Sequence, residues 1–224
     1  MLINLFSIFD SSTSINYSLN WLSSLLIILF LPIIYWFIPS RFNLLFNLIL
    51  DKLINEFKVL LNLKLNNINI ILFLSLFYII ILNNFLGLFS YIFTSSSHII
   101  FGLCYSLILW FSIILYGWIN NFNHIFIHLV PQGTPVLLMF FMVLIETISN
   151  IIRPGTLSVR LSANIIAGHL LITLISNNGS NLIFIILLII LLLQNLLIIL
   201  ELAVSIIQAY VFTVLVTLYR TEVL

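Results

Sequence analysis

The chain has 224 residues, of which 63% are hydrophobic and 6% are charged, with a formal net charge of +1. Soluble domains contain about 45–50% apolar residues, so this composition excludes an ordinary soluble domain and indicates an integral membrane protein. Proteins that bind nucleic acids carry basic patches that neutralise several phosphates, so we expect no nucleic-acid partner. A single cysteine, Cys104, forms neither an intrachain disulfide nor a cysteine-based metal cluster.

Residues 19–38 are the first candidate transmembrane helix. An apolar stretch of this length meets the requirement of about 20 residues for crossing a bilayer. Trp21 lies near its start, and Tyr35 and Trp36 lie near its end, as expected for aromatic residues at membrane interfaces. Pro32 predicts a kink. No Lys or Arg precedes the stretch, which is a poor match to a cleaved signal peptide, so we expect it to be retained.

Residues 40–65 show the pattern of an amphipathic helix, and the segment contains six of the charged residues. Apolar residues recur at helical spacing, and polar residues occupy the opposite side. We therefore expect this helix to lie along the membrane surface with a solvated charged face. The apolar positions are Leu45, Phe46, Ile49, Leu50, Leu53, Ile54, Phe57, Leu60 and Leu61; the polar ones are Asn43, Asn47, Asp51, Asn55, Lys58 and Asn62.

Residues 68–93 and 98–119 are two apolar segments joined by the short polar sequence "TSSS", which is typical of an antiparallel membrane hairpin. We expect His98 to mark its water-facing turn. Residues 120–135 contain Pro, Gly and Asn and are predicted to form an exposed connection. In this connection His124 and His128 are four residues apart, but they lack a nearby third ligand, so no metal site is predicted.

Two unusually long apolar stretches follow, at 135–176 and 182–222. Each holds about 40 residues, or about 60 Å as a continuous helix, which is twice the thickness of the hydrocarbon core. Either each stretch divides into two upright spans, or each is one steeply tilted helix. Only Pro154 and Gly155 interrupt them strongly, so we favour a hairpin of two long, tilted helices. The predicted fold class is an all-α integral membrane protein with one domain spanning residues 1–224.

Polar residues form stripes on both long helices. At about 100° per residue, several of them fall within about 80° of Arg160, and small residues occupy the flank of this stripe. His169 points about 180° away from Arg160. Ionisable groups within membranes usually face a protein interior or a water-filled cavity. The first stripe contains Glu146, Asn150, Arg153, Arg160, Asn164 and Gly168; the second contains Gln194, Glu201, Ser205 and Gln208.

The sequence "IETISNIIRPGTLSVRLSANIIAGHLL", followed by "ELAVSIIQAYVFTVLVTLY", resembles subunit a of the F-type ATP synthase membrane sector in its mitochondrial form. The similarity extends upstream through "LNNFLGLFSY" and "VPQGTP". It implies a multi-pass protein of the mitochondrial inner membrane that moves protons through two offset half-channels. Expected partners are the ring of c subunits, the peripheral stalk and other small membrane subunits. The charged face of residues 51–64 is a candidate contact with the stalk. No cofactor is expected, and ATP chemistry is expected to belong to other chains.

The resemblance also assigns roles to residues by matching position. Arg160 corresponds to the essential cation that faces the ring carboxylates, with Asn164 and Gln208 as its polar neighbours. Glu146 corresponds to the acid near the matrix-side path, and His169 with Glu201 to the pair on the intermembrane-space side, which bacterial relatives carry in the opposite arrangement. Arginine stays charged, so it attracts only a ring carboxylate that has lost its proton and blocks direct leakage between the half-channels.

Register and topology give further expectations. The two long helices are expected to run antiparallel, with residue 160 opposite 208 and residue 169 opposite 201. The midpoint in sequence of both pairs lies near residues 184–185. The visible turn is centred nearer 178–179, so both contacts require a stagger. Lys and Arg are concentrated in the surface helix and at Arg220, which places both on the matrix side and the N-terminus in the intermembrane space. Five membrane segments and one surface helix agree with this topology.

Structural interpretations stay open for each site residue. Arg160 would then be a cation paired within its own subunit, and Arg153 would pair with Glu146 or reach lipid headgroups. The acids and His169 would be hydrogen-bonded supports, and Asn164 and Gln208 would join helices. Asn83 and Asn84 are candidates for the intermembrane-space channel. A secondary transporter would favour internal repeats and interrupted helices, and a purely structural subunit needs no lone arginine on a stripe of small residues.

Overall fold

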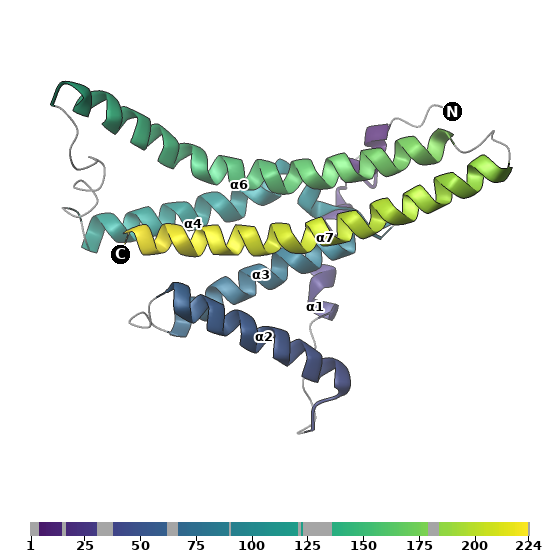
Figure 1. Cartoon of the computed structure of the whole chain (residues 1–224), viewed down its shortest axis with the longest axis horizontal. Helices are drawn as coiled ribbons and strands as arrows, with labels where there is room; N and C mark the ends of the chain where they lie inside the picture. Colours follow the sequence, from purple (N-terminus) through teal and green to yellow (C-terminus); the bar gives the residue numbers. More distant parts are fainter. Residues whose placement is uncertain are drawn as a thin grey trace.

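The computed structural model describes residues 5–14, 17–30, 38–61, 67–89, 91–120, 122, 136–178 and 184–223. Every regular element in these ranges is helical, as predicted (Figure 1). Four helices are long and apolar enough to cross a membrane, at Asn69–Gly87, Ile99–Asn120, Leu138–Asn177 and Ile185–Thr221. The all-α class and the multi-pass character are therefore confirmed.

The N-terminal region differs from the α-helix predicted over 19–38. The chain begins with a short 3₁₀-helix, η1 (Leu5–Phe9). The predicted segment itself starts with a second 3₁₀-helix, η2 (Leu19–Leu26), and within its described residues only α1 (Ile27–Phe30) is α-helical. Serine hydroxyls compete with the backbone for hydrogen bonds, and here Ser24 Oγ donates to the carbonyl of Trp21 at 2.8 Å. Pro32, Tyr35 and Trp36 lie outside the described residues, so the first membrane span stays a prediction.

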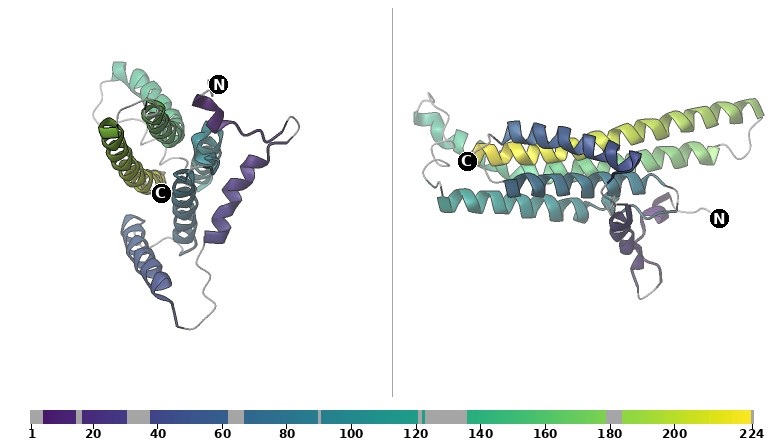
Figure 2. Two further views of the ribbon diagram at one scale, coloured as in Figure 1. Left: turned by 90° about the vertical axis from the view of Figure 1, so that its right-hand side faces the viewer. Right: turned by 90° about the horizontal axis from the view of Figure 1, so that it is seen from below.

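The predicted amphipathic segment forms α2 (Arg41–Leu60), and Ser40 caps it by accepting a hydrogen bond from the backbone N–H of Asn43 at 3.3 Å. Only the C-terminal half of its apolar side is covered by protein. Leu53 and Phe57 are buried in the core, whereas Leu45 is 59% exposed. Figure 2 shows α2 beside the bundle of longer helices. Its place at the membrane surface stays a prediction.

The connection between α3 (Asn67–Gly87) and α4 (Ile99–Asn120) corrects a second expectation. The sequence "TSSS" was predicted to be a short polar turn facing water, but Thr94 and the whole of η3 (Ser95–Ser97) are buried. Much of its polarity is satisfied within the protein, because Thr94 Oγ1 donates to Ser97 Oγ at 3.1 Å and Ser97 Oγ donates to the Thr94 carbonyl at 2.7 Å. The predicted loop 120–135, with His124 and His128, lies almost entirely outside the described residues.

Both long stretches are continuous helices, α6 (Val136–Asn178) and α7 (Phe184–Val223), which run side by side (Figures 1 and 2). α6 runs without a break across Pro154, which removes a backbone donor, and Figure 1 shows that this helix bends near its middle. The tilt of these helices relative to the bilayer stays a prediction.

The core lies where α3, α6 and α7 meet. Leu157 and Leu161 from α6 pack there with Ala209 and Phe212 from α7. On the other side of α6, Gly102 of α4 approaches so closely that an added Cβ would lie 3.1 Å from the Cα of Ser158. Small residues at these contacts let membrane helices approach closely, and this tight packing positions the polar side chains of α6 and α7 relative to each other.

Candidate functional site: a polar cavity between the long helices

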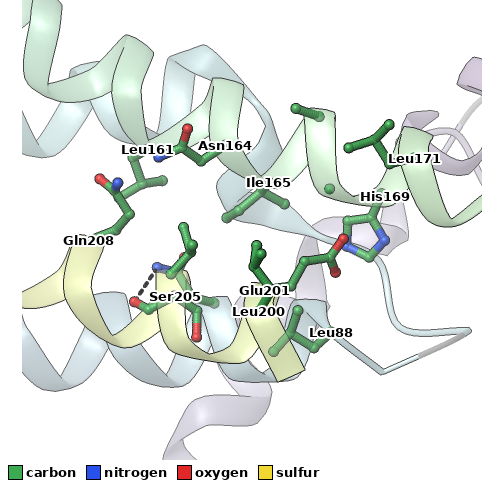
Figure 3. Close-up of a pocket in the computed structure, with 14 residues that line it drawn as sticks. Leu88, Leu161, Asn164, Ile165, His169, Leu171, Leu200, Glu201, Ser205 and Gln208 are labelled. Carbon is green, nitrogen blue, oxygen red and sulfur yellow. Dashed lines mark hydrogen bonds between the residues drawn. The ribbon is translucent and has the colours of Figure 1, made fainter. Parts of the chain in front are cut away.

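A cavity of about 190 Å³ lies between α6 and α7, and residues at and just after the end of α3 also line it (Figure 3). Its walls are mostly apolar, but a set of polar residues also lines it. Four of the predicted site residues belong to this set, and they come from both long helices. The polar lining consists of Asn84, Asn164, His169, Glu201, Ser205 and Gln208. The structure therefore brings Asn164, His169, Glu201 and Gln208 together around one space.

His169 and Glu201 are neighbours in this cavity. Figure 3 shows the carboxylate of Glu201 beside the imidazole of His169. The close approach depends on Gly168, because a Cβ added there would lie 2.7 Å from Cδ and 3.0 Å from Cγ of Glu201. This contact confirms the predicted register of 169 against 201.

Each residue of this pair has one buried polar atom without a partner in the described residues. His169 Nε2 and Glu201 Oε1 have no hydrogen-bond partner among the described residues. The imidazole also lies beside the backbone of Gly87 and 6.2 Å from the ring of Phe9, measured between centroids. Buried polar groups in proteins nearly always bind a protein group or water. An imidazole and a carboxylate that line the same cavity are groups able to accept and release protons.

Arg160 lies outside the cavity, one helical turn before Asn164. Its neighbours Ser158 and Leu161 are buried, whereas Arg160 itself is exposed. It forms no ion pair with a carboxylate in the described ranges. Within that part of the chain, the alternative in which Arg160 pairs with an acid of its own subunit is therefore not found.

Glu146 lies on a part of α6 that is remote from the cavity. Arg153 Nη2 lies 3.9 Å from Glu146 Oε1, as one of the alternatives for Arg153 predicted, and the Arg153 guanidinium carbon lies 5.0 Å from the centre of the Tyr219 ring. Both charged side chains are partly exposed, at 41% for Glu146 and 30% for Arg153. The predicted site residues thus fall into two groups, one at the cavity and one towards the start of α6.

The sequence contained little indication of the places that Asn84 and the serines of η3 take in the structure. Asn84 was only a candidate channel residue, but it lines the cavity, and its side-chain amide donates to the backbone carbonyl of Ser205 at 3.5 Å. The burial of the η3 serines was not predicted, because serines between two apolar segments resemble an ordinary exposed turn.

Among the described residues, no group of His, Cys, Asp and Glu could hold a metal ion.

These features define a multi-pass helical membrane protein whose ionisable side chains gather in and beside a cavity between two long helices. Comparison with known proteins places it further. The sequence pattern of the family described as ATP synthase A chain matches residues 17–221. Among curated relatives, "ATP synthase subunit a" of Drosophila melanogaster is 56% identical over 223 residues, that of Anopheles gambiae 57% over 225, and that of Locusta migratoria 55% over 224; each match covers both chains completely.

The chain belongs to the ATP synthase A chain family. It is a subunit of the membrane sector and is not itself catalytic. Its multi-pass location in the mitochondrial inner membrane agrees with the four helices that are able to span a membrane.

Proposed function

We propose that the chain is the proton-translocating stator subunit of the rotary F-type ATP synthase. Two offset half-channels deliver protons to the carboxylates of the rotating c-ring and remove them, and Arg160 prevents a proton short circuit between the channels. Family membership supports partnership with other ATP synthase subunits. The ring of c subunits, the peripheral stalk and other small membrane subunits are the partners that this role requires.

The observation that carries the proposal is that Arg160 is exposed and forms no ion pair with a carboxylate among the described residues. A charge within a membrane segment is costly unless a partner or water compensates it. Since arginine remains protonated, its natural partner is an ionised carboxylate on a neighbouring protein. A protonated ring carboxylate is neutral and is not held, so the ring is able to turn once the proton is bound.

The cavity supports the intermembrane-space half-channel. His169 and Glu201 are placed to accept and release protons there, and Asn164 and Gln208 provide hydrogen-bonding groups on the side towards Arg160 (Figure 3). The imidazole titrates near neutral pH in ordinary surroundings, which suits a relay that works in both directions. A carboxylate in contact with it offers a second site for the same proton.

Glu146 supports the matrix-side path. Along the helix axis it is about 34 Å from His169, and Arg160 lies between the two. A proton leaving a ring carboxylate on one side of Arg160 therefore does not meet the group that supplied it. Each charge that crosses 100 mV releases about 2.3 kcal/mol, and this separation converts the energy into rotation of the ring.

The test compares Arg160→Ala with Arg160→Lys in the assembled enzyme reconstituted into liposomes. Proton-driven ATP synthesis and passive proton leak through the membrane sector are measured together. We expect Arg160→Ala to abolish coupled synthesis, because the ring carboxylates lose their fixed cation, and to raise the leak. Arg160→Lys keeps the charge without the guanidinium and is expected to leak less. Unchanged coupled synthesis in Arg160→Ala contradicts the proposal.

A further inference from the structure

A hydrogen bond between side chains joins α2 to α7. Tyr210 Oη donates to Glu56 Oε2 at 3.2 Å, although the two residues are 154 positions apart in the sequence. Many hydroxyl groups on the long helices instead bond a carbonyl in the preceding turn of their own helix, as Ser205 does with Leu202 at 2.7 Å. The longer tyrosine side chain reaches a neighbouring helix. Its bond therefore constrains how α2 and α7 lie relative to each other.

The Glu56 end of this bond lies on a firmly packed part of α2. The next residue, Phe57, is completely buried at 0% exposure, and Leu53, one turn earlier, is buried with it in the core to which α3 and α7 also contribute. Nearer the start of α2, the ring of Phe46 packs against Tyr78 of α3, 4.9 Å away between centroids. The backbone of α2 therefore provides a fixed point for the Glu56 carboxylate.

The Tyr210 end lies on a helix whose first half packs little against the described part of the chain. Leu192 and Ile199 are 62% and 69% exposed, and the residues around them are exposed as well. Close contacts begin with Glu201, which meets Gly168 of α6, and they continue to Ala209, which is at 0% exposure in the core. The rotation of α7 about its own axis therefore depends on contacts in its second half.

Three consecutive residues in this half of α7 contact three different surroundings. Gln208 lines the cavity, Ala209 packs in the core and Tyr210 bonds α2. Successive residues lie about 100° apart around a helix, so these contacts are spread around the axis. Apolar packing is non-directional, whereas a hydrogen bond requires a defined distance and angle. Of the three contacts, the Tyr210 bond therefore opposes rotation of α7 most specifically.

We propose that Glu56 and Tyr210 are positioning residues for the proton path, because their hydrogen bond holds α7 at the rotation that turns its polar stripe towards the cavity. Glu201 lies seven residues, or about two helical turns, before Gln208, so both project from the same side of α7. Without the bond, α7 turns about its axis more easily and the Glu201 carboxylate moves away from His169. This inference rests on the proposed function, since it explains how the groups of that path are kept in place.

The first experiment removes the donor and measures proton-driven ATP synthesis per assembled enzyme in liposomes. Tyr210→Phe keeps the ring and deletes the hydroxyl. Both partners are exposed, so water competes for the bond, and we expect synthesis to fall by about fivefold, or about 1 kcal/mol in the barrier. Tyr78→Phe is the matched control, because Tyr78 also faces α2 but its hydroxyl has no hydrogen-bond partner in the described residues. The control is expected to work at the native rate.

The second experiment changes the acceptor. Glu56→Gln keeps a side-chain oxygen that accepts from Tyr210, whereas Glu56→Leu removes it. Glu56→Gln is expected to retain nearly native synthesis, and Glu56→Leu is expected to match Tyr210→Phe. Glu56→Leu combined with Tyr210→Phe is expected to show no further loss, because both changes remove the same bond. If Glu56→Gln is as defective as Glu56→Leu, the carboxylate acts through its charge and the inference is wrong.

The third experiment measures the position of α7 without relying on activity. Gly168→Cys and Glu201→Cys are introduced together in a Cys104→Ser background, because the native cysteine is exposed. A Cβ added at residue 168 would lie 3.0 Å from Cγ of Glu201, so copper phenanthroline is expected to form a disulfide between the two cysteines. Adding Tyr210→Phe is expected to slow disulfide formation by about fivefold, whereas adding Tyr78→Phe is expected to leave the rate unchanged.

The outcomes separate this inference from the proposed function. If Tyr210→Phe matches Tyr78→Phe in synthesis and in disulfide rate while Arg160→Ala abolishes synthesis, the positioning role is wrong and the proposed function stands. If Arg160→Ala leaves synthesis unchanged, the proposed function is contradicted, and the disulfide rate still decides whether the bond holds α7. A bond that serves stability alone would lower the amount of assembled enzyme but neither rate per assembled enzyme, and this result also overturns the inference.

Discussion

Acidic side chains lie near both ends of α6, but their surroundings differ in burial and in pairing. Towards its start, Glu146 is partly exposed and lies beside Arg153. Towards its end, His169 lies beside Glu201 in a cavity, and each residue has a buried atom without a partner in the described part of the chain. The two ends therefore differ in burial and in pairing: the start of α6 is the more open end, and the end at the cavity is the more enclosed one.

The enclosed end predicts the largest effects. Because His169 and Glu201 face each other, His169→Glu or Glu201→His alone leaves two groups of the same kind in the cavity. Each single variant is expected to lower proton flux by about 100-fold, the usual contribution of a positioned acid or base. The double variant restores one imidazole and one carboxylate in contact and is expected to recover most of the flux. Proton-driven ATP synthesis measured across about pH 6–8 checks this. A double variant as inactive as the single ones would show that the pair is not interchangeable.

A smaller effect is expected at Gly168. Gly168→Ala adds a Cβ that would lie 2.7 Å from the Glu201 carboxyl carbon, so the carboxylate must move away from His169. We expect flux to fall by about tenfold, a barrier increase of about 1.4 kcal/mol. Gly155→Ala is the control on the same helix, because its Cβ would meet nothing within 4 Å. If the two variants were equally active, the close approach of Gly168 to Glu201 would not matter for proton transfer, and this prediction would be wrong.

The open end is expected to tolerate change best. Tyr219→Leu removes the ring under Arg153, an interaction worth about 0.5–1 kcal/mol at partly exposed sites, so synthesis should fall by a factor of about 2–5. Tyr219→Phe keeps an aromatic face and should behave like the native protein. Initial rates of ATP synthesis in vesicles are sufficient to measure this difference. A loss as large as that of the cavity variants would mean that the two ends do not differ as proposed.

Much of the fold was predictable because membrane crossing constrains composition strongly. Apolar length indicated the long helices, and the continuity of α7 followed from the lack of polar turns within residues 182–200. The start of the N-terminal segment was predicted less well, since the hydroxyls of Ser23 and Ser24 bond to carbonyls. The candidate site was predictable where residues follow a helical stripe or a family motif, as with Asn164 and His169.

The amino-acid sequence by itself determined that this protein belongs in a membrane and that it is helical, because these properties depend on apolar length and on periodicity along single helices. Only the tertiary structure decided which polar groups are satisfied. It buried the serines of η3, left Ser96 without a protein partner in the described ranges and exposed Arg160 beside the cavity. Hydrogen-bond satisfaction depends on what surrounds an atom in three dimensions, and adjacent serines with the same sequence signal therefore differ in their hydrogen bonding.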